Sequence, residues 1–438
     1  MKNLKQQCKF IVVFFLIICP GILYAQKRSI DIEELVSLAL KNHPQLKVTR
    51  EGIEAAKQEK ALTRLQQLPS LSASASALYL GDVLVVDKDF SKTIPIPSPN
   101  FGNSYSLQAS ELIFKGGLIK KFIQVADLKT QLSELELTTN QQAIKYLVIS
   151  NYLDLYKLEN QEKVYENNKK LAQERLENIT KFYSQGMITR NEVIRNQLNI
   201  KSIEQAILVV ENNRNILNYN LDLALGLSTE TLLEPTEEVA LPLNKKNVGY
   251  YIDLARENNP QLRSAFTHVE LAEKNIALIK TDKLPGISAI AGYNMQKPIT
   301  NRVPVLDMYS NTWSVGISLT YNIDNLYKSN KRVRLGEIQK IQSEDVLEVL
   351  KQNLSMGINA AYTKYQEAAT NVSILKEAMN LAQENYRIIE SKYLNQLAIQ
   401  AEMTDAINEK IEAEIKYSDA EINVLYQYYN LLKTTGTL

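Results

Sequence analysis

Four segments of the chain alternate between apolar and polar residues, which is the period-two pattern of β-strands. In the clearest segment every second residue is apolar: Trp313, Val315, Ile317, Leu319, Tyr321 and Ile323. The residues between them are small and uncharged. The pattern predicts four strands, at 70–80, 104–114, 286–296 and 312–323, and Glu111 is the one residue that breaks the alternation.

Helical patterns flank each pair of strands. Residues 32–67 and 250–283 precede the strand pairs and are predicted to be helical. Each pair is followed by a much longer stretch without proline, 118–181 and 328–391. At 1.5 Å per residue, each of these stretches could form a helix of about 100 Å. The segment 81–103 between the first two strands is predicted to be a long loop.

The long helices and their return arms carry apolar residues in steps of three and four, the heptad spacing of coiled coils. The clearest seam consists of Val372, Leu375, Met379, Ala382, Tyr386, Ile389 and Tyr393. In the first half of the chain, polar residues interrupt the seam at Glu162, Lys169, Asn196 and Arg214. The pattern predicts two antiparallel helical hairpins, 118–225 and 328–433.

The second half of the chain repeats the first. Pro44-Gln45-Leu46 returns 216 residues later as Pro260-Gln261-Leu262, and Tyr219-Asn220-Leu221 returns 210 residues later as Tyr429-Asn430-Leu431. A duplication of this kind indicates a body built around an axis or a stack. We therefore expect a first repeat at 26–226, a linker at 227–247 and a second repeat at 248–438.

Residues 1–25 have the pattern of a secretory signal peptide. Three lysines precede an apolar run from Phe10 to Cys19, which is too short to span a bilayer as a helix. Ala25 offers a small residue for cleavage. The chain has two cysteines, Cys8 and Cys19, and both lie in this segment, so the mature protein is expected to be free of disulfides and cysteine metal ligands.

Composition and motifs give no support for an enzyme. The chain of 438 residues has 50 basic and 49 acidic side chains; removal of the lysine-bearing signal leaves 47 and 49, so no nucleic-acid partner is indicated. No phosphate-binding glycine loop, metalloprotease motif or nucleophile elbow occurs. His43 and His268 occupy different repeat positions, and neither has an evident partner. We therefore expect no catalytic residues, cofactor or metal site.

The strands admit two interpretations. They form either a soluble antiparallel sheet on a core or transmembrane strands with lipid on one side and water on the other. The uncharged polar face, the export signal and aromatic residues toward the strand ends favour the membrane. These interface aromatics are Tyr79, Tyr105, Tyr293, Trp313 and Tyr321. Because four strands cannot close a barrel and open edges are not tolerated in lipid, several chains would have to share one barrel, as a dimer, trimer or tetramer.

Several motifs, in their order along the chain, resemble the TolC family of outer membrane efflux proteins. They are Asn42-His43-Pro44-Gln45-Leu46, its counterpart Asn258-Asn259-Pro260-Gln261-Leu262, Leu68-Pro69-Ser70-Leu71, Phe114-Lys115-Gly116-Gly117 and Tyr183-x-x-Gly186-x-x-Thr189-x-x-Glu192-Val193. The resemblance covers roughly 30–436. It implies a mainly α-helical fold with transmembrane β-strands: a homotrimer with a twelve-stranded β-barrel in the outer membrane and a long coiled-coil tunnel in the periplasm.

The resemblance also implies roles for individual residues. It places Glu402 and Asp405 at the constriction of the tunnel, and it gives Glu192 and Tyr393 a part in holding neighbouring hairpins together. The hairpin tips would be Gly186 with Met187 and Gln396 with Leu397. Two departures stand out, because Gln396 replaces an expected glycine and Ala398 replaces an arginine that some members use to lock the closed end.

The function expected from this resemblance is that of a non-enzymatic exit duct in the outer membrane. A periplasmic adaptor and an inner membrane transporter would be its partners, and the transporter would drive export of small molecules. Two alternatives stay open. One is the outer membrane component of type I protein secretion, and the other is a periplasmic coiled-coil scaffold that does not span the membrane.

Overall fold

A computed structural model describes residues 27–236, 246–299 and 305–438. The expected signal peptide and part of the expected linker, 237–245, lie outside these ranges. The chain divides into two compact units. The first comprises Met1–Lys47, Asn140–Asn258 and Ser355–Leu438, and the second comprises Val48–Thr139 and Asn259–Leu354. The long helices α4 (Leu118–Ser184) and α8 (Asn325–Leu394) contribute to both units.

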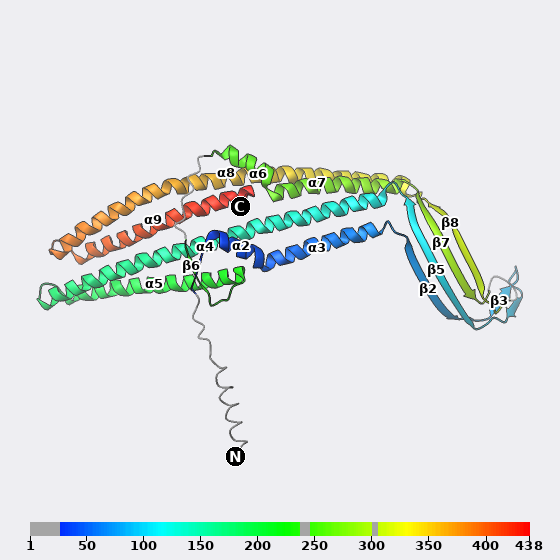
Figure 1. Cartoon of the computed structure of the whole chain (residues 1–438), viewed down its shortest axis with the longest axis horizontal. Coiled ribbons are helices and arrows are strands. Elements are labelled where there is room, and N and C mark those ends of the chain that lie inside the picture. Colours follow the sequence, from blue (N-terminus) through cyan, green and yellow to red (C-terminus); the bar gives the residue numbers. More distant parts are fainter. Residues whose placement is uncertain (1–26, 237–245, 300–304) are drawn as a thin grey trace, which may run out of the picture. The chain divides into compact units, whose positions relative to one another are not determined.

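The first unit consists of two helical hairpins and the elements packed on them. In Figure 1, α4 turns back as α5 (Arg190–Leu225), and α8 turns back as α9 (Gln400–Thr435). The shorter helices α2 (Ile32–Asn42) and α6 (Val248–Asn258) complete the unit. Its core contains fully buried side chains from α2, α4 and α5, among them Leu35, Tyr152 and Leu221.

The helices expected at 32–67 and 250–283 are each broken, which corrects the prediction of continuous helices. α2 ends at Asn42 and α3 (Pro44–Leu65) begins after one intervening residue, His43; α6 and α7 (Pro260–Ile279) are separated in the same way by Asn259. His43 and Asn259 are extended, with ψ of 125° and 118°. A proline disfavours helical backbone at the residue before it, and this clash explains both breaks.

The second unit contains a four-stranded antiparallel sheet in the order β2-β5-β7-β8. The strands are β2 (Ser70–Tyr79), β5 (Phe101–Phe114), β7 (Gly286–Lys297) and β8 (Ser310–Thr320), and they lie side by side in Figure 1. The two strands of one repeat and the two of the other thus form a single sheet. β2 and β8 are its edges and run in opposite directions.

The two faces of the sheet differ in polarity, as the alternation predicts. On one face the pairing aligns hydroxyl side chains, and Ser74 with Ser106 and Ser76 with Ser104 are hydrogen-bonded at 2.8 Å. The other face is apolar and exposed, with Ile317 78% accessible. Glu111 lies on this apolar face, in register with Ala289 of β7. The sheet therefore has an apolar face that no described residue of its own unit buries.

Four short strands were not predicted. The expected loop 81–103 contains an antiparallel ribbon of β3 (Val83–Val86) and β4 (Thr93–Ile96). In the first unit, β1 (Lys27–Ile30) pairs in parallel with β6 (Leu232–Pro235), which lies in the segment expected to be a linker. No helix in the described part of the chain is both long and apolar enough to cross a membrane.

A buried carboxyl group stands beside β6. Asp222 of α5 is fully buried; its Oδ2 accepts a hydrogen bond from Asn218 Nδ2 at 3.0 Å, and its Oδ1 has no partner among the described residues. Asn218 also accepts from the backbone N–H of Leu233 at 2.7 Å. Burial raises the pKa of Asp222 to about 6. The folded protein therefore holds a proton that the unfolded chain releases near pH 4.

The replacement of Asp222 by Asn should remove this pH dependence. For the wild type, stability falls as pH rises from about 4 through 6, because the buried carboxylate becomes charged, with a loss on the order of 1–3 kcal/mol. We expect Asp222→Asn to match the wild type near pH 4 and to have a higher melting temperature at pH 7.5, measured by circular dichroism. The exposed Asp253→Asn is the control, and equal melting curves for Asp222→Asn and wild type at pH 7.5 would contradict the prediction.

Candidate functional site

The two hairpin tips have the same turn geometry. At the end of α4, the N–H of Gly186 donates to Tyr183 O at 3.0 Å and the N–H of Met187 donates to Phe182 O at 3.0 Å. At the end of α8, the N–H of Gln396 donates to Tyr393 O at 3.0 Å and the N–H of Leu397 donates to Lys392 O at 2.8 Å. Both patterns are Schellman motifs, which need a left-handed residue after the helix.

The second tip adopts this turn without glycine. The φ angle is 75° at Gly186 and 60° at Gln396, so both residues lie in the left-handed region. A side chain makes that conformation costly, by about 1–2 kcal/mol. The departure at Gln396 therefore leaves the turn unchanged but adds backbone strain. Met187 and Leu397 follow the left-handed residues and are exposed at the two tips.

Glu192 and Tyr393 come from different hairpins and line the same cavity of about 250 Å³ between the tips. Burial, and then the charge of Glu192, raise the pKa of the Tyr393 hydroxyl. Glu192 and Tyr393 are not hydrogen-bonded to each other in the structure; near the tips, the hydrogen bonds between the two hairpins involve Asn196 and Gln400. Tyr393 donates to Gln400 Oε1, and Asn196 Nδ2 donates to the same oxygen at 3.1 Å. Asn196 and Gln400 thus bridge α5 to α8 and α9.

The sequence carried a signal for part of this bridge. Asn196 interrupts the apolar seam of α5, and the structure buries it. Two other interruptions, Arg214 and Glu162, pair with each other at 3.0 Å across the first hairpin. A polar residue in a heptad seam is costly unless it has a partner, so these three interruptions mark specific contacts between helices, whereas Lys169 pairs with Glu166 of its own helix. Gln400 gave no such signal.

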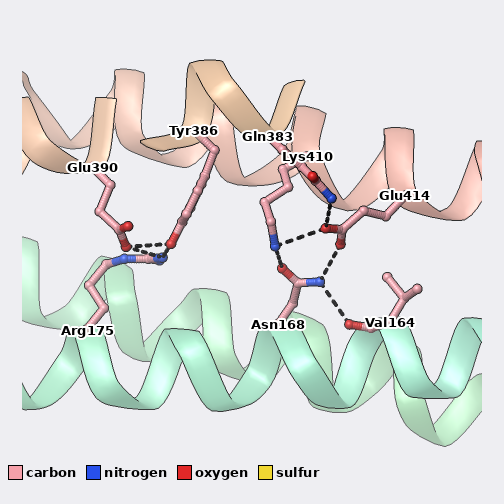
Figure 2. A network of polar contacts seen from close by, with 8 residues as sticks. All are labelled: Val164, Asn168, Arg175, Gln383, Tyr386, Glu390, Lys410 and Glu414. Carbon is pink, nitrogen blue, oxygen red and sulfur yellow. Dashed lines mark hydrogen bonds and ion pairs between the residues drawn. The ribbon is translucent and has the colours of Figure 1, made fainter. Parts of the chain in front are cut away.

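Further along the hairpins, a polar network joins the first hairpin to the second. Figure 2 shows its two halves. In one half, Asn168 Nδ2 donates to Glu414 Oε2 at 3.0 Å, while Lys410 Nζ donates to Asn168 Oδ1 at 2.8 Å. In the other half, Arg175 donates to the Tyr386 hydroxyl at 2.6 Å, and Tyr386 donates to Glu390 at 2.5 Å. Helix α4 is thereby tied to both α8 and α9.

Arg175 is a buried charged member of this network. It is only 5% exposed, and its Nε and Nη1 have no partner among the described residues. Burial, and then the hydrogen bond to Glu390, raise the pKa of Tyr386 to about 12, so its hydroxyl stays protonated and can donate. A buried network of this kind is strong only while every member is held, because each lost partner leaves a desolvated charge. The interface between the hairpins is therefore specific to one register, because a shift would leave these buried groups without partners.

The two predicted constriction acids have different surroundings. Glu402 Oε2 accepts a hydrogen bond from the N–H of Ile399 at 3.1 Å, so this carboxylate caps the start of α9. Asp405 lies one turn further along α9 and is exposed. Ala398, where some family members have an arginine, lines the tip cavity. Among the described residues, no group of His, Asp and Glu has the arrangement of metal ligands.

The predicted interface aromatics are exposed on the apolar face or at its ends. Tyr293 lies directly opposite Trp313, and Tyr105 lies one row away, opposite Met295. Tyr321 follows β8, eight residues beyond Trp313. At about 3.4 Å per residue, this spacing is roughly 27 Å of strand, comparable to the apolar band of membrane barrels. Tyr79 pairs with Phe101 at the end of the sheet away from the helices.

The comparison with known families decides the identity. The model for outer membrane efflux proteins matches residues 35–227 and 251–437, one match for each repeat. The chain belongs to the outer membrane efflux protein family. The expected resemblance, the outer membrane localisation and the assignment as a channel protein, not an enzyme, are therefore confirmed. A comparison with curated protein sequences finds no match.

Solved structures show the same fold at low sequence identity. The outer-membrane channel OprN has a TM-score of 0.76 and 15% identity, with 93% of this chain and 90% of that chain covered. VceC from Vibrio cholerae has a TM-score of 0.75 and 14% identity, with 92% and 96% covered. The CmeC channel from Campylobacter jejuni has a TM-score of 0.75 and 15% identity, with 93% and 85% covered. The expected TolC-like fold is confirmed.

The strain at Gln396 gives a test of the tip geometry. Gln396→Gly should raise the free energy of unfolding by about 1 kcal/mol, because glycine adopts the left-handed conformation without a steric penalty. The reciprocal change Gly186→Gln should lower it by a similar amount. Denaturant unfolding followed by circular dichroism measures both. A loss of stability in Gln396→Gly would show that contacts of the glutamine side chain in the tip cavity outweigh the strain.

Proposed function

We propose that three copies of this chain form one exit duct. The observation that carries the proposal is the exposed apolar face of a four-stranded sheet with two open edges. Lipid does not tolerate unpaired strand edges, so the sheet has to be closed by other copies. β8 and β2 run in opposite directions, so β8 of one copy can continue into β2 of the next as an antiparallel pair. The family supplies the number three, which gives twelve strands.

The helical hairpins fit the same assembly. Apolar side chains stand exposed on the outer surfaces of both hairpins, including Leu198 and Ile216 on α5 and Ile374 and Leu381 on α8. Exposed apolar stripes on long helices favour packing against further helices. Hairpins from three copies would close into a tunnel that continues from the barrel into the periplasm.

The tips would form the closed end of the tunnel. The bridge through Asn196 and Gln400 and the network around Arg175 hold the hairpins of one copy together. Opening requires these contacts to separate, and a periplasmic adaptor that binds the open arrangement more tightly would shift the equilibrium toward it. An inner membrane transporter would supply the energy, and the duct itself would conduct small molecules passively.

Membrane insertion can be tested on neighbouring residues of β8. Ile317 lies on the apolar face and Ser318 on the hydroxyl face. Ile317→Arg should cost about 2–4 kcal/mol in the membrane and reduce the assembled fraction, whereas Ser318→Arg should be much milder because it faces water. Assembly is measured in outer membrane fractions and by light scattering in detergent. Equal tolerance of both variants, or a stable monomer in detergent, would refute the duct.

The constriction can be tested by neutralising its acids. In a trimer, Glu402 and Asp405 of each copy would place six carboxylates around a narrow axis, which would attract cations. The double variant Glu402→Gln with Asp405→Asn should lose cation preference and block by multivalent cations in single-channel recordings. Glutamine retains an oxygen that can cap α9. Glu412→Gln, elsewhere on α9, is the control, and unchanged selectivity in the double variant would remove both residues from the constriction.

A further inference from the structure

The β3–β4 ribbon projects from the end of the sheet that is remote from the helices. Its pairing places Leu84 opposite Pro95 and Val86 opposite Thr93, so these four residues share one face. All four are exposed, with Leu84 63% accessible. The opposite face carries Val83 and Ile96, which are half-buried, and Val85 and Ile94, which are exposed at the outer end of the ribbon. An isolated two-stranded ribbon is at best marginally stable in water, so a partner on either face would stabilise it, and the Leu84 face is exposed along its whole length.

The base of the ribbon is fixed to the sheet. The N–H of Leu80 donates to Asn100 O at 2.8 Å, and Asn100 Nδ2 donates back to Leu80 O at 3.2 Å. One step further out, the N–H of Ser98 donates to Asp82 Oδ1 at 3.2 Å. The direction of the ribbon is therefore set by the strands that carry it. It connects the edge strand β2 to β5, so it stands at one edge of the sheet.

The opposite edge of the sheet carries a second exposed apolar site at the same end. The connection from β7 to β8 places Met308 and Tyr309 directly before β8, and Met308 is 62% accessible. This site is held on its own sheet. Asn103 of β5 donates to the Tyr309 hydroxyl at 3.2 Å, so the hydroxyl end of this ring points inward over the sheet, and Lys297 pairs with Asp307 at 3.0 Å.

We propose that the Leu84–Val86–Pro95 face of one copy packs on Met308 and Tyr309 of the neighbouring copy. The inference rests on the proposed barrel, in which β8 of one copy lies beside β2 of the next. That arrangement brings the ribbon of one copy next to the β7–β8 connection of the other. The contact would extend the interface between neighbouring copies beyond the strands β8 and β2. Repeated once per copy around the symmetry axis, these contacts would form a closed ring.

The charges of the ribbon favour a second copy over an anionic lipid surface. Between Val83 and Ile96 the charged residues are Asp87, Lys88, Asp89 and Lys92, which sum to zero. A ribbon without net charge has no electrostatic attraction to phosphate headgroups. Pro95 removes a backbone donor from β4, which hinders addition of a strand along that edge. These two features favour side-chain packing on an apolar neighbour.

Cysteine cross-linking tests the contact directly. The variant Leu84→Cys with Met308→Cys, in the protein purified in detergent, should give covalent dimers and trimers with a short bismaleimide, and the two single variants should not. Leu84→Cys with Leu326→Cys is the matched control, because Leu326 is exposed at the other end of the sheet, after β8. Both natural cysteines lie at positions 8 and 19, and Cys8→Ser with Cys19→Ser removes any contribution from them.

The outcomes separate this contact from the duct itself. A trimer by light scattering without the Leu84–Met308 cross-link would overturn the contact and leave the duct intact, whereas a monomer would overturn the duct. Cross-linking of the single Leu84→Cys variant would show that ribbons pack on one another instead. Protection of a fluorophore on Leu84→Cys only in lipopolysaccharide-containing vesicles, without cross-linking, would assign the face to lipid and would also overturn the contact.

A second measurement covers the case in which the cross-linking variant assembles poorly. Leu84→Ser with Val86→Ser should lower the temperature at which the trimer dissociates on a gel by several degrees. Phe90→Ser, a change at an exposed apolar residue of the ribbon tip outside the proposed face, should leave that temperature unchanged. Equal dissociation temperatures for all three proteins would contradict the contact.

Discussion

The rest of the structure depends on the hydrogen bonds that the sheet cannot make by itself. β2 and β8 are edge strands, so each exposes a row of backbone N–H and C=O groups without strand partners. The apolar face of the sheet suits lipid, and in lipid no water is available to hydrogen-bond these groups. Oligomerisation is therefore a condition for the membrane-inserted state. The duplication of the chain fits this condition, because each repeat contributes two long strands and one helical hairpin. In the proposed assembly, each repeat would add the same elements to the barrel and to the tunnel.

The helical hairpins are stabilised by both apolar and polar contacts. They are held by apolar seams along much of their length, yet the contacts that join one hairpin to the other are polar at Asn168, Arg175 and Asn196. An apolar layer gains free energy in almost any register, whereas a hydrogen-bonded layer has one good arrangement and fails when it shifts. Apolar contacts also cross between the hairpins, where Ile411 packs on the cluster around Ala172 and Ile200, so the polar contacts add a preferred register to an interface that is partly apolar.

Sequence patterns predicted the parts of the fold that depend on periodicity. Alternation gave the long strands, and heptad spacing gave the hairpins, since both periods follow from which face is buried. They missed the breaks at His43 and Asn259, although the following prolines were visible, because the apolar pattern continues across them. They also missed the β1–β6 pair and the role of Gln400, which depend on contacts between residues more than 200 positions apart. No local pattern encodes such contacts.

The parallel pair of β1 and β6 has a consequence for the order of folding. Lys27 pairs with Leu232, so the first described strand finds its partner only after the whole first repeat has been delivered. The cost in entropy of closing so long a loop falls once the hairpin of α4 and α5 has brought its ends together. β1 therefore docks late, onto a hairpin that is already formed. We therefore expect β1 to be among the last parts of its repeat to fold, although it is the first strand of the described chain.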